Sequence, residues 1–134
     1  MSGEDRLRVI REAIDETDKE LLKLLNQRME LACRIGRVKA EQRLLLFDPG
    51  REEAILDRLA AANHGPTLEA SLRAIFREIF SASRRLQYDF QVAFLGPEGT
   101  YSHSAAQARF GEAVAMLPLV SIEDVFQAVQ DGSA

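Results

Sequence analysis

The sequence predicts an all-α domain built on one very long N-terminal helix, followed by a β-α-β-α fragment of an incomplete α/β domain. Apolar residues recur at helical spacing, without an intervening proline, from residue 5 to residue 43. Two shorter helical patterns follow. After residue 90 the pattern changes to short apolar runs that alternate with helical segments. We therefore expect two parts, residues 1–90 and residues 91–134.

The first helical stretch is longer than the chain can cover by itself. A helix of about 39 residues, at about 1.5 Å per residue, is roughly 58 Å long, whereas a compact globule of this chain length is about 36 Å across. The helix must pack along a second long element, most simply its symmetry mate in a homodimer. Asp5 is the expected N-cap, and Gly36 indicates the close approach of a neighbouring helix.

Cationic side chains interrupt the apolar stripe of this helix. Arg28 follows Leu24 by four residues and Lys39 follows Ile35 by four, so both point where the stripe points. They lie about three turns apart, roughly 17 Å of rise, and could hold a small dianion between them. Arg11 lies about 100° away around the helix. It could join such a site only from another chain.

A second helix is expected over residues 49–62. Asp48 and Pro49 have the residue types of an N-cap and a first helical position. The helix should end in the turn at residues 63–66, where Gly65 is expected to adopt the left-handed conformation. The apolar stretch at residues 44–47 breaks the preceding helical pattern.

A third helix is expected to open at Thr67. Its apolar face continues, in steps of three and four, to Ser83 and Gln87. These two residues are one turn apart and share a surface. Spacing alone equally allows a helix end that frays into solvent.

The last 44 residues have the alternating pattern of an α/β unit. The expected order is strand 91–95, helix 102–110, strand 116–120 and helix 122–130. A parallel sheet normally has more strands, with both faces covered. We therefore expect the sequence to end partway through a second domain.

The charge distribution argues against several classes of partner. Residues 1–88 hold 16 Lys and Arg against 15 Asp and Glu, and the remaining residues hold one against six. Neither part has the basic character of a nucleic-acid-binding protein. No apolar run approaches the ~20 residues of a membrane span, there is no signal peptide, and the single Cys33 excludes an intrachain disulfide. We expect a cytoplasmic protein that binds neither nucleic acid nor membrane.

The polar residues expected to point inward form a mainly cationic set: Arg11, Arg28, Lys39, Arg51, Glu52, Ser83 and Gln87. The helical part has no Ser-His-Asp arrangement, metal-ligand spacing or phosphate loop. We expect no cofactor and no metal. Such a set suits a site that holds a dianion, compresses a flexible substrate and stabilises charge that builds on one oxygen.

Several spacings together carry a family resemblance. They are Ile10-Arg11-x-x-Ile14-Asp15, Leu21-Leu22-x-Leu24-Leu25 with Gln27-Arg28, Gly36-x-x-Lys39, Asp48-x-x-Arg51-Glu52 and Ser83-x-x-x-Gln87. With them, residues 5–88 resemble the all-helical class of chorismate mutases, as found at the N-terminus of bifunctional chorismate mutase–prephenate dehydratases. Residues 92–106, VAFLGPEGTYSHSAA, resemble the first strand, turn and helix of the prephenate dehydratase domain.

The resemblance implies an intertwined homodimer of three-helix subunits with two sites. The reaction would be the Claisen rearrangement of chorismate to prephenate, in phenylalanine and tyrosine biosynthesis, without a cofactor. Residues matching Arg11, Arg28 and Arg51 hold the two carboxylates in such enzymes, Ser83 would assist, and Arg11 would come from the other subunit.

The remaining roles implied by the resemblance concern the ether oxygen and the ring hydroxyl. Lys39 and Gln87 would hydrogen-bond the ether oxygen, where negative charge grows as the C–O bond breaks. Glu52, with the backbone at Asp48, would receive the ring hydroxyl. We expect Lys39, Gln87 and Glu52 to be the catalytic residues.

The sequence departs from the family pattern in two places. Residues 44–47 are more apolar than expected for this loop. The Thr-Arg-Phe segment that carries the catalytic threonine of prephenate dehydratases is absent, so we expect neither dehydratase activity nor feedback inhibition by phenylalanine from this polypeptide.

Two alternatives remain open. One is a helical dimerisation module, which leaves unexplained why polar residues interrupt the apolar helix faces. The other is a mutase-like domain that acts only as a regulatory or assembly partner of another enzyme.

Overall fold

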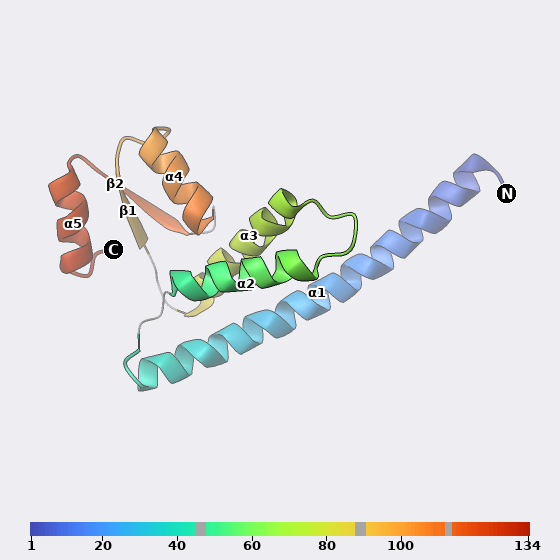
Figure 1. The fold of residues 1–134 in the computed structure, drawn as a ribbon, viewed down its shortest axis with the longest axis horizontal. Coiled ribbons are helices and arrows are strands. Elements are labelled where there is room, and N and C mark those ends of the chain that lie inside the picture. Colours follow the sequence, from blue (N-terminus) through green and yellow to red (C-terminus); the bar gives the residue numbers. More distant parts are fainter. Residues whose placement is uncertain (45–47, 88–90, 112–113) are drawn as a thin grey trace.

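The computed structural model describes residues 1–44, 48–87, 91–111 and 114–134. Its elements, in chain order, are α1 (Gly3–Glu41), α2 (Pro49–Ala62), α3 (Glu69–Gln87), β1 (Gln91–Leu95), α4 (Tyr101–Phe110), β2 (Ala115–Leu119) and α5 (Ile122–Gln130). The predicted order of helices and strands is confirmed. α3 packs on α1, and α2 packs on α3. The N-terminal half of α1 extends beyond both helices (Figure 1).

The long helix α1 begins with a capping box. Ser2 is the N-cap, and its Oγ accepts a hydrogen bond from the Asp5 backbone N–H at 3.1 Å. The Asp5 carboxylate accepts in return from the Ser2 backbone N–H at 3.2 Å. The prediction that Asp5 is the cap is therefore wrong, because Asp5 fills the third helical position of the reciprocal motif.

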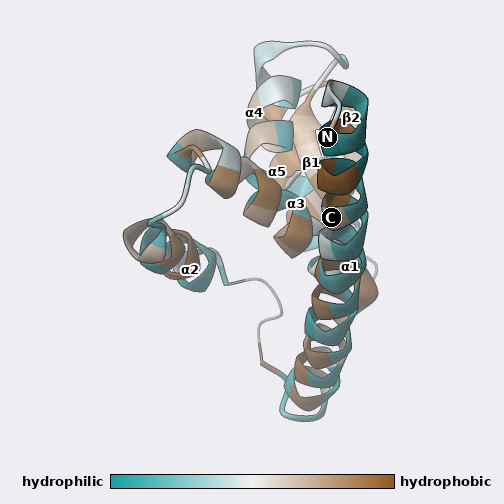
Figure 2. Ribbon diagram, turned by 90° about the vertical axis from the view of Figure 1, so that its right-hand side faces the viewer, coloured by the Kyte–Doolittle hydropathy of each residue, from teal (hydrophilic) through white to brown (hydrophobic). Residues whose placement is uncertain are grey.

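The N-terminal half of α1 exposes an apolar face. Its large apolar side chains between Leu7 and Leu25 are 36% to 60% exposed. Figure 2 shows these apolar segments alternating with polar ones along the helix. Apolar surface of this extent is typical of a helix that packs against a partner. The described part of this chain leaves the face uncovered.

The second helix starts as predicted and ends differently. Asp48 is the N-cap of α2, and its Oδ1 accepts from the Arg51 backbone N–H at 3.0 Å. At the other end Gly65 lacks the predicted left-handed conformation. The Asn63 side chain makes the turn instead, since it accepts from the Gly65 N–H at 3.2 Å and donates to the Thr67 carbonyl at 2.7 Å. The third helix then begins at Glu69, two residues after the predicted start.

The contact between α1 and α3 is unusually close at Gly36. A Cβ atom there would lie 3.0 Å from Cγ and 3.3 Å from Cα of Gln87. The prediction that a neighbouring helix approaches Gly36 is confirmed. The buried core of the helical part includes Ala32 of α1, Leu56 of α2 and Phe80 of α3, each at most 5% exposed.

The C-terminal elements form a small α/β unit. β1 and β2 pair in parallel, with Gln91 opposite Ala115 and Leu95 opposite Leu119. α5 packs on this sheet, and α4 packs on both β1 and α3. The predicted β-α-β-α order is thus confirmed within the described ranges.

Two further predictions concern the apolar stretch at residues 44–47 and the absence of a membrane span. The apolar connection at 44–47 falls outside the described residues from residue 45 onward. In the part of the chain that the structure describes, no helix has both the length and the apolar character needed to cross a bilayer.

We predict that Gly36→Val destabilises the helical part. Its side chain has no room against Gln87, so we expect a loss of about 1–3 kcal/mol of unfolding free energy, measured in urea. Gly3→Val is the matched control, because it is also in α1 and nothing lies within 4 Å of its Cβ position. Equal losses in the two variants would contradict the tight contact.

Candidate active site

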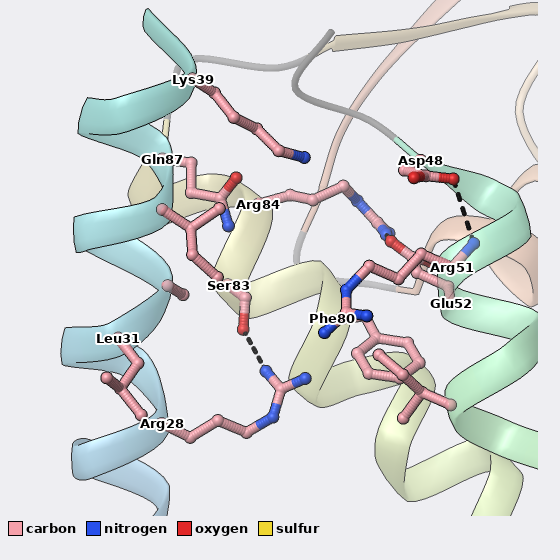
Figure 3. A pocket seen from close by; sticks show the side chains of 13 residues that line it. Arg28, Leu31, Lys39, Asp48, Arg51, Glu52, Phe80, Ser83, Arg84 and Gln87 are labelled. Carbon is pink, nitrogen blue, oxygen red and sulfur yellow. Dashed lines mark hydrogen bonds and ion pairs between the residues drawn. The ribbon is translucent and has the colours of Figure 1, made fainter. Parts of the chain in front are cut away.

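A cavity of about 260 Å³ lies between α1, α2 and α3 (Figure 3). Its lining residues are Arg28, Leu31, Ala32, Ile35, Lys39, Asp48, Arg51, Glu52, Ile55, Phe80, Ser83, Arg84 and Gln87. The structure thus brings seven of the eight predicted site residues together. Arg11, the eighth, does not line the cavity and lies on the exposed N-terminal half of α1.

Arg28 is held at one end of the cavity by two contacts with α3. Its Nη1 donates to Ser83 Oγ at 3.0 Å, and its guanidinium carbon lies 5.2 Å from the centroid of the Phe80 ring. Burial lowers the pKa of Arg28 from its ordinary value, the positive charge of Arg51 lowers it further, and Glu52 opposes both. Arginine still stays protonated at neutral pH. A bound anion would offset this unfavourable electrostatic environment.

Ser83 is part of the cavity wall and not of a frayed helix end. It is 5% exposed, and its Oγ donates to the Ile79 carbonyl at 2.8 Å while it accepts from Arg28. The fraying alternative left open by the spacing is therefore wrong. Gln87, one turn later, packs against Gly36 and also lines the cavity.

Lys39 and Gln87 lie together at the opposite end of the cavity from Arg28. Figure 3 shows Lys39 projecting from α1 into the cavity, next to Gln87 from α3. An ammonium and a side-chain amide can both donate hydrogen bonds. This end of the cavity can therefore present two donors to one acceptor atom.

The first turn of α2 supplies the remaining predicted residues. Asp48 caps the helix through the Arg51 N–H, and Figure 3 shows the Arg51 side chain reaching into the cavity in the direction of Arg28. Two guanidinium groups on facing walls repel each other unless an anion lies between them. The arrangement favours a ligand with more than one negative charge.

The sequence reasoning missed Arg84. It is 3% exposed and lines the cavity. Its Nη1 pairs with Glu52 Oε2, and its Nη2 donates to the Phe110 carbonyl at 2.9 Å. A signal was present, because Arg84 follows the apolar Phe80 by four residues, the same step that led from Ile79 to Ser83.

The side chains that line the cavity can bind an anion. Arg28, Lys39 and Arg51 place cationic groups around it, whereas Glu52 is already paired with Arg84. Within residues 1–44, 48–87, 91–111 and 114–134, no cluster of His, Cys, Asp and Glu could hold a metal ion. Charge-assisted hydrogen bonds from such groups are short and strong, and they suit two carboxylates.

Comparison with known proteins gives two family matches. The family model described as chorismate mutase type II matches residues 10–88, and the prephenate dehydratase model matches residues 92–134. The bifunctional chorismate mutase/prephenate dehydratase of Pseudomonas aeruginosa is 35% identical over an alignment of 138 residues, gaps included, and the match covers 99% of this chain and 38% of that protein. The protein of the same name from Aquifex aeolicus is 38% identical over 130 residues, covering 94% and 36%.

Among solved structures, the chain is similar to chorismate mutase (form II) from Thermus thermophilus. The TM-score is 0.60 at 40% sequence identity, and the match covers 61% of this chain and 93% of that one. This similarity therefore concerns the greater part of the Thermus chain. By contrast, the chain spans 38% of the length of the Pseudomonas relative.

We predict that a small dicarboxylate such as succinate stabilises the protein through this cavity. At ten times its dissociation constant it should add about 1.4 kcal/mol and raise the unfolding temperature by a few degrees, as scanning calorimetry would detect. Succinamide has the same shape without charge and should have no such effect. Arg28→Ala and Arg51→Ala should abolish the shift, whereas Arg37→Ala, an exposed cation of α1 outside the cavity lining, should keep it. A shift that survives both cavity substitutions would contradict the site.

Proposed function

The chain belongs to the chorismate mutase type II family, and from that premise we propose that it rearranges chorismate to prephenate in the cavity between α1, α2 and α3. The observation that carries this proposal is the convergence of Arg28, Lys39 and Arg51 on one cavity. The reaction is an intramolecular Claisen rearrangement. One C–O bond breaks as one C–C bond forms, and no proton, electron or second reactant is exchanged.

We assign the two substrate carboxylates to the arginines. Arg28 and Arg51 reach the cavity from α1 and α2, and the lowered pKa of Arg28 supports this assignment, because burial and the charge of Arg51 leave its own charge poorly compensated. Ser83 fixes the Arg28 guanidinium and can assist with the same carboxylate. Holding both carboxylates keeps the flexible enolpyruvyl group over the ring, so a reactive conformation is selected before bond breaking.

We assign the ether oxygen to Lys39 and Gln87. Negative charge builds on this oxygen in the transition state, and donors aimed at developing charge stabilise the transition state more than the substrate. The two residues lie at the same end of the cavity (Figure 3). Gln87 is held in place because it packs directly on Gly36. We assign the ring hydroxyl to Glu52 and to the backbone at Asp48, at the start of α2.

We further propose that the site is completed in an intertwined homodimer. Arg11 lies on the part of α1 that extends beyond α2 and α3, and the apolar face there is exposed. Pairing of two α1 helices would bury this face and bring Arg11 of the partner subunit to the cavity. A third cation would then be available for the carboxylates.

The division of the chain is also a proposal. We assign residues 1–90 to the mutase and residues 91–134 to the start of a prephenate dehydratase-like domain. The β-α-β-α order and the family match to residues 92–134 support the second assignment. The Pseudomonas relative is named as a bifunctional enzyme. We propose that a protein continuing through a complete second domain carries the dehydratase activity as well.

The wild-type chain should consume chorismate, followed by its absorbance. Lys39→Ala and Gln87→Ala should each lower kcat by about 10²–10³-fold, because each removes a donor to the ether oxygen. Lys23→Ala is the matched control, since this exposed α1 residue does not line the cavity. Helicity should be unchanged in all three variants. No turnover by the wild type, or loss of turnover in step with helicity, would contradict the proposal.

A mixture of two inactive variants tests the shared site. Arg11→Ala and Lys39→Ala subunits, unfolded together in equal amounts and refolded, should form mixed dimers in which one of the two sites is intact. We expect about a quarter of the wild-type activity, given random pairing of subunits in a two-fold symmetric dimer. Activity no higher than the sum of the separate variants would exclude donation of Arg11 across subunits.

A further inference from the structure

Arg84 joins the cavity to the C-terminal part of the chain. Its Nη1 pairs with the Glu52 carboxylate in α2, and its Nη2 donates to the Phe110 carbonyl at the end of α4 at 2.9 Å. The guanidinium carbon also lies 5.6 Å from the centroid of the Phe110 ring. Because the guanidinium is planar and rigid, the position of the α4 end and the position of the Glu52 carboxylate are linked through one side chain.

The end of α4 is itself fixed on α3. Gly111 follows Phe110 with φ of +80°, and a Cβ there would lie 2.8 Å from Cβ and 3.0 Å from Oγ of Ser81. Ser81 is fully buried. The segment can therefore approach α3 this closely only with glycine at position 111.

A second cation, from α4, also faces Glu52. Arg109 Nη1 lies 4.0 Å from Glu52 Oε1 and 3.6 Å from Glu53 Oε1. The Glu52 side chain is 14% exposed. Both of its oxygens thus lie against cations, one from α3 and one from α4. Removing a buried partner would leave the carboxylate free to adopt another rotamer or to pair with a cavity cation.

We propose that Arg84 is a positioning residue for Glu52, and that the docking of α4 on α3 holds Arg84 in the orientation required. This inference rests on the proposed function, in which Glu52 receives the ring hydroxyl of chorismate. It gives residues 91–134 a role in the affinity of the mutase site for chorismate, although no described residue of that segment lines the cavity. Because the hydroxyl contact is made in both the substrate and the transition state, its loss should appear mainly in KM.

The first test is a double-mutant cycle in the 134-residue chain, with kcat and KM measured for chorismate. Arg84→Met should raise KM so that kcat/KM falls by on the order of 10- to 100-fold, the usual effect of losing a residue that orients another in a site. Arg84→Lys retains the charge and should recover part of the loss. In a Glu52→Gln background Arg84→Met should change KM less than about two-fold, because the group on which Arg84 acts is already altered.

The second test separates the docking of α4 on α3 from the charge of Arg84. Gly111→Ala should raise KM in the same direction as Arg84→Met, since the added methyl cannot fit against Ser81. Gly99→Ala is the matched control: Gly99 has φ of +81°, so the backbone strain is equal, but nothing lies within 4 Å of its Cβ position. Gly99→Ala should leave KM unchanged. Circular dichroism should show equal helicity in the two variants.

The outcomes distinguish the inference from the function on which it rests. A wild-type chain without chorismate turnover would overturn both. An active wild type in which Arg84→Met and Glu52→Gln have additive effects would overturn only the positioning role. A fall in kcat with unchanged KM would do the same, because it indicates either a smaller fraction of folded enzyme or the loss of an interaction made only in the transition state, and neither is the hydroxyl contact assigned to Glu52. Equal KM values for Gly111→Ala and Gly99→Ala would overturn the role of α4.

Discussion

The close contact of α3 with α1 at Gly36 is the constraint on which the cavity depends. Only a residue without a side chain allows the Gln87 backbone to lie 3.3 Å from a Cβ position on α1. This approach brings α3 near enough for Ser83 to accept from Arg28 at 3.0 Å. The helix-propensity cost of glycine within a helix is about 1 kcal/mol. Here that cost is offset by packing that aligns donors from two helices around one space.

The electrostatics of this space are suited to a reaction without proton transfer. Arg28, Lys39 and Arg51 surround the cavity, and the nearby acid Glu52 is paired with Arg84. A cavity of this kind holds a dianion and stabilises charge that develops within it, because its donors are already oriented. Desolvation of Arg28 is unfavourable and lowers its pKa. A bound dianion would offset it, so that ligand binding and the stability of the fold are coupled.

Helical periodicity predicted the helices and four of the residues that line the cavity, since side chains three and four residues apart share a face whatever the tertiary structure. It placed Arg28 and Lys39 on one stripe and Ser83 with Gln87 on another. The residue types at the helix ends predicted the Asp48 cap of α2 but not two other ends: Ser2 caps α1, and the Asn63 side chain makes the turn expected of Gly65. Arg84 was missed for another reason. The four-residue step from Phe80 puts Arg84 on the inner face of α3, but its partners Glu52 and Phe110 lie in other elements, and spacing within α3 does not reveal which elements meet there.

The central claim is that this cavity binds the rearranging substrate with its ether oxygen between α1 and α3. A crystal structure of the chain with a bicyclic dicarboxylate transition-state analogue tests it most directly. We expect the carboxylates on Arg28 and Arg51, the ether oxygen within hydrogen-bond distance of Lys39 Nζ and the Gln87 side chain, and Arg11 of a second subunit beside a carboxylate. An analogue bound outside the cavity, or bound with its ether oxygen away from both Lys39 and Gln87, would contradict the account.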